Sequence, residues 1–165
     1  MDDAAKAQLA AMGAACYALQ ARKTANALAR AYNAAGIGDG LEMTQFSTLC
    51  AIALETASST AELARGLGID RSTLVRNLEI LRRKALITSS EKGRGAVHRL
   101  TAVGRRTVQR GLPKWIEMQA RVEAGLKDAG GPDPRIALRT LRRAVRASEP
   151  EDRAAPVTAA SGRPG

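Results

Sequence analysis

The sequence predicts a mainly α-helical chain with a small β-hairpin, arranged as a winged helix–turn–helix with a helical dimerisation region contributed by both chain ends. Three observations predict it: two short helices around a tight turn in residues 59–83, a hairpin with a basic tip directly after them, and long apolar helical stripes near both ends of the chain. A helix–turn–helix presents its second helix to the major groove of DNA. This order of elements therefore indicates a nucleic-acid-binding lobe.

The two short helices are defined by the residues that begin and end them. Ser59 can cap the first helix, with Glu62 completing a capping box, and Gly68 suits the left-handed residue that follows a helix end. Asp70 can cap the second helix. The apolar residues of that helix recur at i, i+4 and i+7, namely Leu74, Leu78 and Leu81.

The opposite face of the second helix is polar. Its residues are Ser72, Thr73, Arg76 and Asn77. An Arg side chain matches the paired acceptors of guanine, and an Asn amide matches the donor and acceptor of adenine. We therefore expect these four side chains to read base edges, and Arg71 to meet phosphate or the minor groove.

A hairpin follows, made of two strand-like runs at 87–91 and 96–100 joined by Lys92-Gly93-Arg94-Gly95. The glycines permit the backbone angles of a tight turn, and the two cations point to solvent. A basic tip beside a recognition helix is typical of a wing, whose Arg fits a narrow minor groove. We expect Lys92 and Arg94 to contact phosphate or the minor groove, although a plain solvated turn is the simpler alternative.

The charge of the chain is concentrated on the same elements. The chain has 165 residues, 45% of them hydrophobic, and a net charge of +10. Residues 71–110 contain 11 Lys or Arg against 2 Glu, a net charge of +9. Charge gathered in this way favours a polyanionic partner over a uniformly basic surface. The length fits one domain, with or without an appended helical part.

Three further features indicate the compartment. No run of 18 or more apolar residues is present, which predicts no membrane span. The acidic start Met1-Asp2-Asp3 lacks the basic residues of a signal peptide. The two cysteines, Cys16 and Cys50, make no disulfide framework and suit a reducing cytosol. We therefore expect a cytoplasmic protein.

Taken together, these motifs resemble those of the MarR family of bacterial winged helix–turn–helix regulators, and the likeness runs from about residue 9 to residue 126. The residues that carry it are Thr44-Gln45-Phe46, Leu49, Glu62-Leu63-Ala64, the stretch 68–74, Arg76-Asn77-Leu78, Leu81, Ala85-Leu86-Ile87, Leu100-Thr101 and Gly104-Arg105. The resemblance implies a homodimeric, sequence-specific transcriptional regulator, most often a repressor, that leaves DNA on binding a small ligand or on thiol oxidation. It implies no cofactor.

Two positions depart from the family pattern. The family's wing usually carries Asp-Arg-Arg, and Lys92-Gly93-Arg94 keeps only the last Arg, so the Asp that braces it is missing. The Gly that usually precedes the wing strand is Ala85 here. The first departure leaves the aim of Arg94 open.

Helical segments at both ends predict dimerisation. We expect a single domain over residues 1–147, in which helices at about 4–35 and 108–147 form a dimerisation region around a winged-helix lobe at about 43–107. Apolar residues recur in the terminal segments at spacings of three and four. A symmetric dimer can place its two recognition helices in successive major grooves, about 34 Å apart. Residues 148–165, rich in Pro and Gly, are expected to be disordered.

The terminal segments also predict three local details. Residues 4–35 contain no proline and are expected to form one helix, with Cys16 in its apolar seam. Pro113 lies inside the long helix expected after Thr101 and should kink or split it, because proline lacks the N–H that a helix needs. Gln119 interrupts the apolar seam of the same helix.

Cys16 has two interpretations. The stretch Cys16-Tyr17-Ala18-Leu19 resembles the surroundings of the peroxide-sensing cysteine in a thiol-based branch of the MarR family, and Arg22 and Lys23 follow closely enough to favour a thiolate. Cysteine also packs as a small hydrophobe, and Cys16 occupies a seam position. Sensing and packing both stay open. Cys50 shares a helix face with Phe46 and is expected in the core.

The resemblance further implies a small effector, often an aromatic acid, held between the dimer helices and the DNA lobe. The candidate pocket residues are aromatic side chains and one cation, namely Tyr17, Arg22, Tyr32, Phe46 and Trp115. Arg30 is a second candidate partner for a carboxylate. The alternative for each is an ordinary core or surface role.

The sequence contains no pattern typical of catalysis or metal binding. The one histidine, His98, falls on an expected wing strand between basic residues, where a surface position near phosphate is the simpler interpretation. No Cys and His cluster has zinc spacing, and no Gly-rich loop leads from a strand into a helix. We expect a protein that is not an enzyme. Two alternatives stay open: a non-specific nucleoid-type DNA-binding protein, and a redox or small-molecule sensor module with weak DNA binding.

Overall fold

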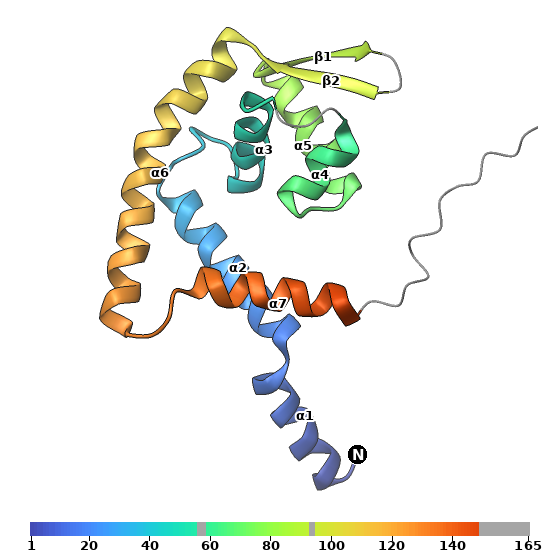
Figure 1. Cartoon of the computed structure of the whole chain (residues 1–165), viewed down its shortest axis with the longest axis vertical. Coiled ribbons are helices and arrows are strands. Elements are labelled where there is room, and N and C mark those ends of the chain that lie inside the picture. Colours follow the sequence, from blue (N-terminus) through green and yellow to red (C-terminus); the bar gives the residue numbers. More distant parts are fainter. Residues whose placement is uncertain (56–58, 93–94, 149–165) are drawn as a thin grey trace, which may run out of the picture. The chain divides into compact units, whose positions relative to one another are not determined.

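Seven helices and one antiparallel hairpin follow one another along the part of the chain that the computed structural model describes, residues 1–55, 59–92 and 95–148. In chain order they are α1 (Asp3–Ala15), α2 (Tyr17–Ala34), α3 (Met43–Ala53), α4 (Thr60–Leu67), α5 (Arg71–Arg83), β1 (Ile87–Lys92), β2 (Gly95–Leu100), α6 (Ala102–Ala129) and α7 (Pro134–Ser148) (Figure 1). The predicted mainly α-helical fold with a small hairpin is confirmed. Internal contacts divide the chain into two units, residues 1–122 and the residues from 123 onward.

The core of the first unit lies between α3, α4, α5 and the hairpin. Its buried apolar side chains include Phe46, Leu49 and Ile52 of α3, Leu63 and Ala64 of α4, Leu74, Leu78 and Leu81 of α5, and Ile87 of β1. Burial of one such large side chain contributes about 1.5–3 kcal/mol. Figure 1 shows α3, α4 and α5 gathered below the hairpin, which is the winged helix–turn–helix that the sequence predicts.

Ser59, Gly68 and Asp70 occupy the helix-end positions that the sequence predicts for them. The Ser59 hydroxyl accepts a hydrogen bond from the Glu62 backbone N–H at 3.2 Å. Gly68 ends α4 with φ of 65°, in the left-handed region that favours glycine. Asp70 then accepts the Thr73 backbone N–H at 2.8 Å, so the chain turns and restarts a helix within three residues.

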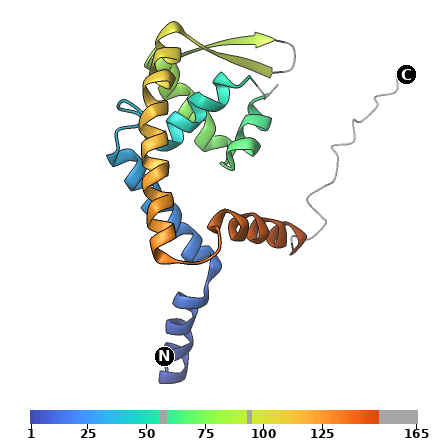
Figure 2. The same cartoon turned by 60° about the vertical axis from the view of Figure 1, so that its left-hand side comes forward.

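The hairpin runs from Ile87 opposite Leu100 to Lys92 opposite Gly95. Each strand is thus one residue longer than predicted. Arg99 Nη1 donates to Glu55 Oε1 at 3.2 Å, which ties β2 to the chain just after α3. In Figures 1 and 2 the hairpin extends over the same side of the lobe as α4 and α5.

α6 approaches the lobe closely because two of its residues have no side chain. A Cβ atom at Gly104 would lie 2.1 Å from the Leu86 carbonyl oxygen, and one at Gly111 would lie 2.4 Å from Phe46 Cζ. Pro113 follows inside α6, which continues as one helix, so of the two expected outcomes the split does not occur. Residues on both sides of the proline contact the lobe. Gly111 before it packs against Phe46, and Lys114 Nζ after it donates to the Gly36 carbonyl at 3.0 Å.

Polar contacts join α2 to α3 and α6. The Asn33 side chain accepts the Met43 backbone N–H at 2.7 Å and donates to the Glu42 carboxylate, so a residue of α2 helps to cap α3. The Tyr32 hydroxyl donates to Gln119 Oε1 at 2.7 Å. This bond explains why a polar residue interrupts the apolar seam of α6.

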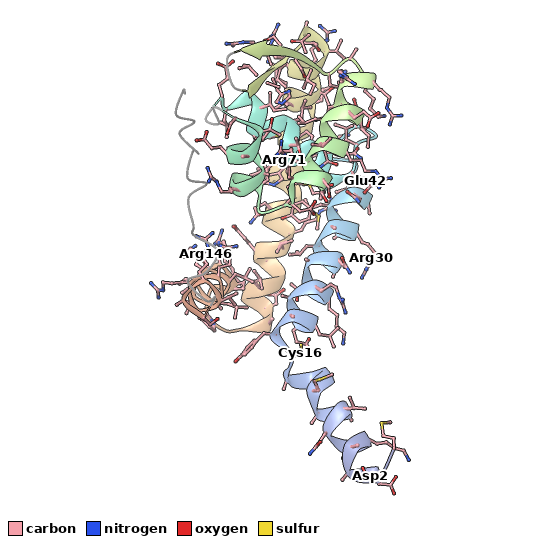
Figure 3. The ribbon with its side chains drawn as sticks, turned by 90° about the vertical axis from the view of Figure 1, so that its right-hand side faces the viewer. Asp2, Cys16, Arg30, Glu42, Arg71 and Arg146 are labelled. Carbon is pink, nitrogen blue, oxygen red and sulfur yellow. The ribbon has the colours of Figure 1, made fainter. Side chains whose placement is uncertain are left out.

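The prediction of a single helix over residues 4–35 is wrong, because the helix is interrupted at Cys16 (Figure 3). Cys16 adopts an extended backbone, with φ of −71° and ψ of 108°, and separates α1 from α2. Gln20 Nε2 donates to the carbonyl oxygens of Gly13 at 3.1 Å and Ala14 at 3.3 Å. The Gln20 amide therefore satisfies carbonyls that the end of α1 leaves without helical partners.

In the second unit, α7 is amphipathic and buries none of its residues. Its apolar face includes Leu138, Leu141 and Val145, of which Leu138 and Val145 are exposed and Leu141 is half-buried. Asp133 caps the helix by accepting the Arg135 backbone N–H at 2.9 Å. The stretch expected to be disordered, 148–165, lies outside the described residues apart from Ser148. Among the helices within the described ranges, none has both the length and the apolarity needed to cross a membrane.

Candidate nucleic-acid interface

The start of α5 is organised around the Asp70 carboxylate. It accepts hydrogen bonds from the Ser72 hydroxyl at 2.5 Å and from the Thr73 backbone N–H and hydroxyl at 2.8 and 2.7 Å. These three bonds hold the pKa of Asp70 well below its ordinary value. Because both hydroxyl protons point at Asp70, the two oxygens are left to accept hydrogen bonds, as from the amino groups of cytosine or adenine.

Arg71, Ser72 and Arg76 are exposed and Thr73 is half-buried, as expected for side chains that face a ligand. Val75 lies between them with 51% of its surface exposed. An exposed aliphatic side chain on a recognition helix can contact the methyl group of thymine. The sequence pattern does not identify Val75, because it is an apolar residue outside the Leu74, Leu78 and Leu81 stripe and outside the polar face.

Asn77 does not face outward, and the prediction that it does is wrong. Only 5% of its surface is exposed, and its Nδ2 donates to Thr48 Oγ1 of α3 at 3.3 Å. Asn77 comes three residues after Leu74 and four before Leu81, and this spacing returns to the same side of a helix. The helical period therefore places Asn77 on the buried stripe, where only its polar side chain suggested otherwise.

A hollow of about 480 Å³ lies where α5 meets the hairpin and the start of α4. Its polar lining consists of Thr60, Arg71, Glu79, Arg82, Ser89, Ser90 and His98, and its apolar lining of Val75, Leu78 and Ala96. Two guanidinium groups and three hydroxyls provide donors that suit phosphate oxygens, with one carboxylate among them. The stripe Arg71, Val75, Leu78, Arg82 follows helical spacing, so a helical projection of the sequence would have found Arg82.

His98 lies half-buried on β2 rather than on an open strand surface. Its Nδ1 is 2.9 Å from the Ser89 hydroxyl, and its buried Nε2 has no hydrogen-bond partner among the described residues. Burial lowers the pKa of His98, which favours the uncharged ring. A neutral His98 leaves the cationic character of the hollow to the two arginines.

The predicted wing contacts fall where the structure describes little. Lys92 belongs to β1 by its backbone, and nothing is described of its side chain. Arg94 lies outside the described residues. Their contacts with DNA therefore stay predictions.

The five candidate effector residues are not brought together. Phe46 and Trp115 share a hollow of about 320 Å³ between α3 and α6 with Met43, Cys50, Leu54 and Leu112. Tyr32 lines another, of about 330 Å³, with Leu28, Leu67 and Ile69 among its neighbours. Tyr17 and Arg22 are exposed on α2. The hollow beside Trp115 is mainly apolar and is the better match to an aromatic molecule.

The two thiols differ in their surroundings. Cys50 is half-buried against the core, and burial raises its pKa to about 11, so it is a protonated thiol at neutral pH. Cys16 is half-buried at the break between α1 and α2 (Figure 3). Arg22 and Lys23 are exposed on α2. Within the described parts of the chain, no group of three or more His, Cys, Asp or Glu is placed to hold a metal ion.

The chain is similar to transcriptional regulators of known structure. It is 35% identical to the M. tuberculosis regulator MosR, over 82% of this chain and 98% of that one, with a TM-score of 0.71. A structure of MosR in complex with DNA matches at 37% identity over 80% and 97% of the two chains, with a TM-score of 0.69. A MarR/EmrR family regulator from Acinetobacter sp. ADP1 has the same fold at 23% identity, over 78% and 93%, with a TM-score of 0.65. No protein-family model and no curated protein matches the chain.

Proposed function

Since the chain belongs to the MarR family of winged-helix transcriptional regulators, we propose that it binds duplex DNA sequence-specifically as a homodimer and acts as a repressor. The observation that carries the proposal is the exposed start of α5 beside a hollow lined by two arginines. A face of this kind suits base edges in the major groove, and the hollow suits the adjoining phosphate backbone. The MosR structure in complex with DNA supports the same use of the fold. The similar structures are regulators, and we propose no catalytic activity.

Six residues of α5 have proposed roles. Ser72, Thr73 and Arg76 read bases, and Val75 contacts a thymine methyl group. Arg71 and Arg82 meet phosphates from the hollow between α5 and the hairpin. On the wing, Lys92 and Arg94 contact phosphate or the minor groove.

Homodimerisation is proposed from the apolar surface of the terminal helices. Leu9 and Met12 of α1 are 49% and 59% exposed, and Leu138 and Val145 of α7 are 41% and 50% exposed. A second copy of the chain would cover such stripes, since apolar surface of this extent is rarely left to solvent. Each dimer then presents two copies of α5 to successive major grooves, about 34 Å apart.

Release from DNA is proposed to follow from a change in the distance between the two copies of α5. A small aromatic or acidic effector in the hollow beside Phe46 and Trp115 would act on α3 and α6, which both line it. Oxidation of Cys16 would act at the break between α1 and α2. Either event shifts binding only by its differential free energy between the two arrangements of the dimer.

The proposal is tested by selecting bound fragments from the source genome and measuring competition at a fixed salt concentration. We expect the recovered sequence to be preferred over a scrambled duplex of equal composition by roughly 10³-fold or more, as specific regulators achieve. A preference near onefold would contradict the proposal and favour a non-specific nucleoid-type protein. A chain that ignored both duplexes at low salt would favour a sensor module instead.

A further inference from the structure

A polar bridge joins two helices in the core of the winged-helix lobe. Asn77 of α5 is 5% exposed and Thr48 of α3 is fully buried. Asn77 Nδ2 donates to Thr48 Oγ1 at 3.3 Å, and Thr48 Oγ1 donates to the Thr44 carbonyl oxygen at 2.8 Å. The bridge therefore runs from the recognition helix to the backbone of α3.

The direction of each bond in this bridge is fixed. The hydroxyl proton of Thr48 is used by the Thr44 carbonyl, so Thr48 Oγ1 is left as an acceptor. Asn77 satisfies it only with its Nδ2 turned toward α3. A rotation of α5 that moves the amide away breaks the bond and leaves a buried donor without a partner.

The remaining contacts of α5 with the core have no such direction. Leu74, Leu78 and Leu81 are buried beside Asn77, and apolar contact is non-directional. A stripe of leucines therefore favours burial of this face and tolerates small rotations of the helix. A hydrogen bond adds an angular requirement. The free-energy cost of leaving a buried amide unpaired is larger than the net gain from forming the bond, so other orientations of the helix are disfavoured.

We propose that the Asn77–Thr48 bond is a positioning contact that fixes the rotation of α5 about its own axis, and with it the aim of Arg76. Arg76 precedes Asn77 directly and is exposed, so the two side chains turn together with the helix. A rotation of about 10° at the outer radius of a helix, roughly 5–6 Å, displaces a side chain by about 1 Å. A displacement of that size spoils the geometry of a bidentate contact to a base. The inference rests on the proposed sequence-specific binding.

The test uses two substitutions at Thr48, which is fully buried and so cannot itself touch DNA. Thr48→Val keeps the shape of the side chain and removes the hydroxyl, whereas Thr48→Ser keeps the hydroxyl and removes the methyl group. The probes are the duplex that the wild-type protein selects most strongly from a randomised pool and a scrambled duplex of equal composition. The preference is the ratio of the two dissociation constants at one salt concentration.

We expect Thr48→Val to lower this preference by about tenfold or more, comparable to the loss of one good base contact, with little change for scrambled DNA. Thr48→Ser should keep the preference despite losing core volume. A preference in Thr48→Val within threefold of the wild-type value overturns the proposal. An equal fall in Thr48→Ser also overturns it, because volume rather than the bond would then matter.

A second variant guards against poor folding of Thr48→Val. In Asn77→Leu/Thr48→Val both polar groups are replaced by apolar groups of similar shape, which leaves no unpaired amide and preserves or raises the melting temperature. We expect this stable protein to show the same loss of preference, while Leu81→Met, a matched change on the same buried stripe, keeps it. Unchanged preference in the double variant overturns the proposal. If the wild-type protein selects no duplex at all, the proposed function fails instead.

Discussion

The winged-helix lobe and the terminal helices use similar apolar residues to different effect. In the described parts of the chain, the buried hydrophobic side chains all lie between Ile37 and Ile87, whereas α1, α2 and α7 bury none. The lobe buries its core with its own residues, because α3, α4, α5 and the hairpin pack their apolar faces against one another. The terminal helices carry stripes of the same kind that this chain leaves open to solvent. We therefore expect the lobe to be stable within a single chain, and the stability of the terminal helices to depend on dimerisation.

Removal of a core leucine should give the largest effect. Leu81 is fully buried in α5, and Leu81→Ala should lower the free energy of unfolding by about 2–5 kcal/mol through lost burial and a cavity. Denaturant unfolding at two protein concentrations measures it. The matched change Leu138→Ala on α7 should cost less, and its cost should vary with protein concentration. Equal costs for both would contradict the distinction between the two regions.

A charge on the apolar face of α7 should separate the proposed dimer. Leu138→Glu places a carboxylate where a second copy is expected to pack, and should weaken self-association by about tenfold or more, or roughly 1.4 kcal/mol. Sedimentation measures the dissociation constant. Arg143→Gln changes the net charge by the same amount at an exposed position on the opposite side of α7 and serves as the control. An unaltered dimer in Leu138→Glu would show that this face is not the interface.

A smaller gain in stability is expected at Ala85, which has φ of 55° where the family has Gly. The left-handed region costs a residue with a Cβ about 1–2 kcal/mol, partly offset by the extra freedom of Gly in the unfolded chain. Ala85→Gly should thus raise the free energy of unfolding by up to about 1 kcal/mol. The same change at exposed Ala120 inside α6 should lower it by a similar amount. A loss of stability in Ala85→Gly would rule out strain at that residue.

The smallest effect concerns pH. Hydrogen bonds from Ser72 and Thr73 hold the pKa of Asp70 below its ordinary value, so its ionised form stabilises the folded lobe. This contribution is complete above the unfolded pKa, about 3.9, and is lost as pH falls through the lower folded pKa. Asp70→Asn caps the helix without titrating, so its deficit in melting temperature should be constant above about pH 5 and shrink below pH 4. A deficit that did not change between pH 6 and pH 3 would show that the Asp70 charge does not stabilise the lobe.

Local signals were sufficient to predict the lobe. The caps at Ser59 and Asp70, the glycine at position 68 and the leucine stripe of α5 each act within a few residues, and the structure has them as predicted. The break at Cys16 could not be predicted in this way. The Gln20 amide bonds back to the end of α1 at this break, and Gln is an ordinary helix residue that gives no signal of it in the sequence.

The errors in the predicted site also come from contacts that the local sequence does not show. Residue type placed Asn77 on the outer face, although its spacing from Leu74 and Leu81 is that of a core position. The aromatic residues proposed as one pocket come from α2, α3 and α6, and composition does not say which of them meet. Contacts with residues distant in sequence, such as Thr48 for Asn77, determine both where Asn77 points and which aromatic residues share a hollow.

The most direct test of whether the outer face of α5 reads DNA is the binding of Arg76→Ala to selected and scrambled duplexes at one salt concentration. We predict a loss of roughly 1–3 kcal/mol, about 5- to 150-fold, on the selected duplex and a much smaller loss on the scrambled one. Arg71→Ala, at a proposed phosphate contact, should weaken binding to both duplexes alike. An equal loss on both duplexes for Arg76→Ala would contradict the account, since Arg76 would then contact only the DNA backbone.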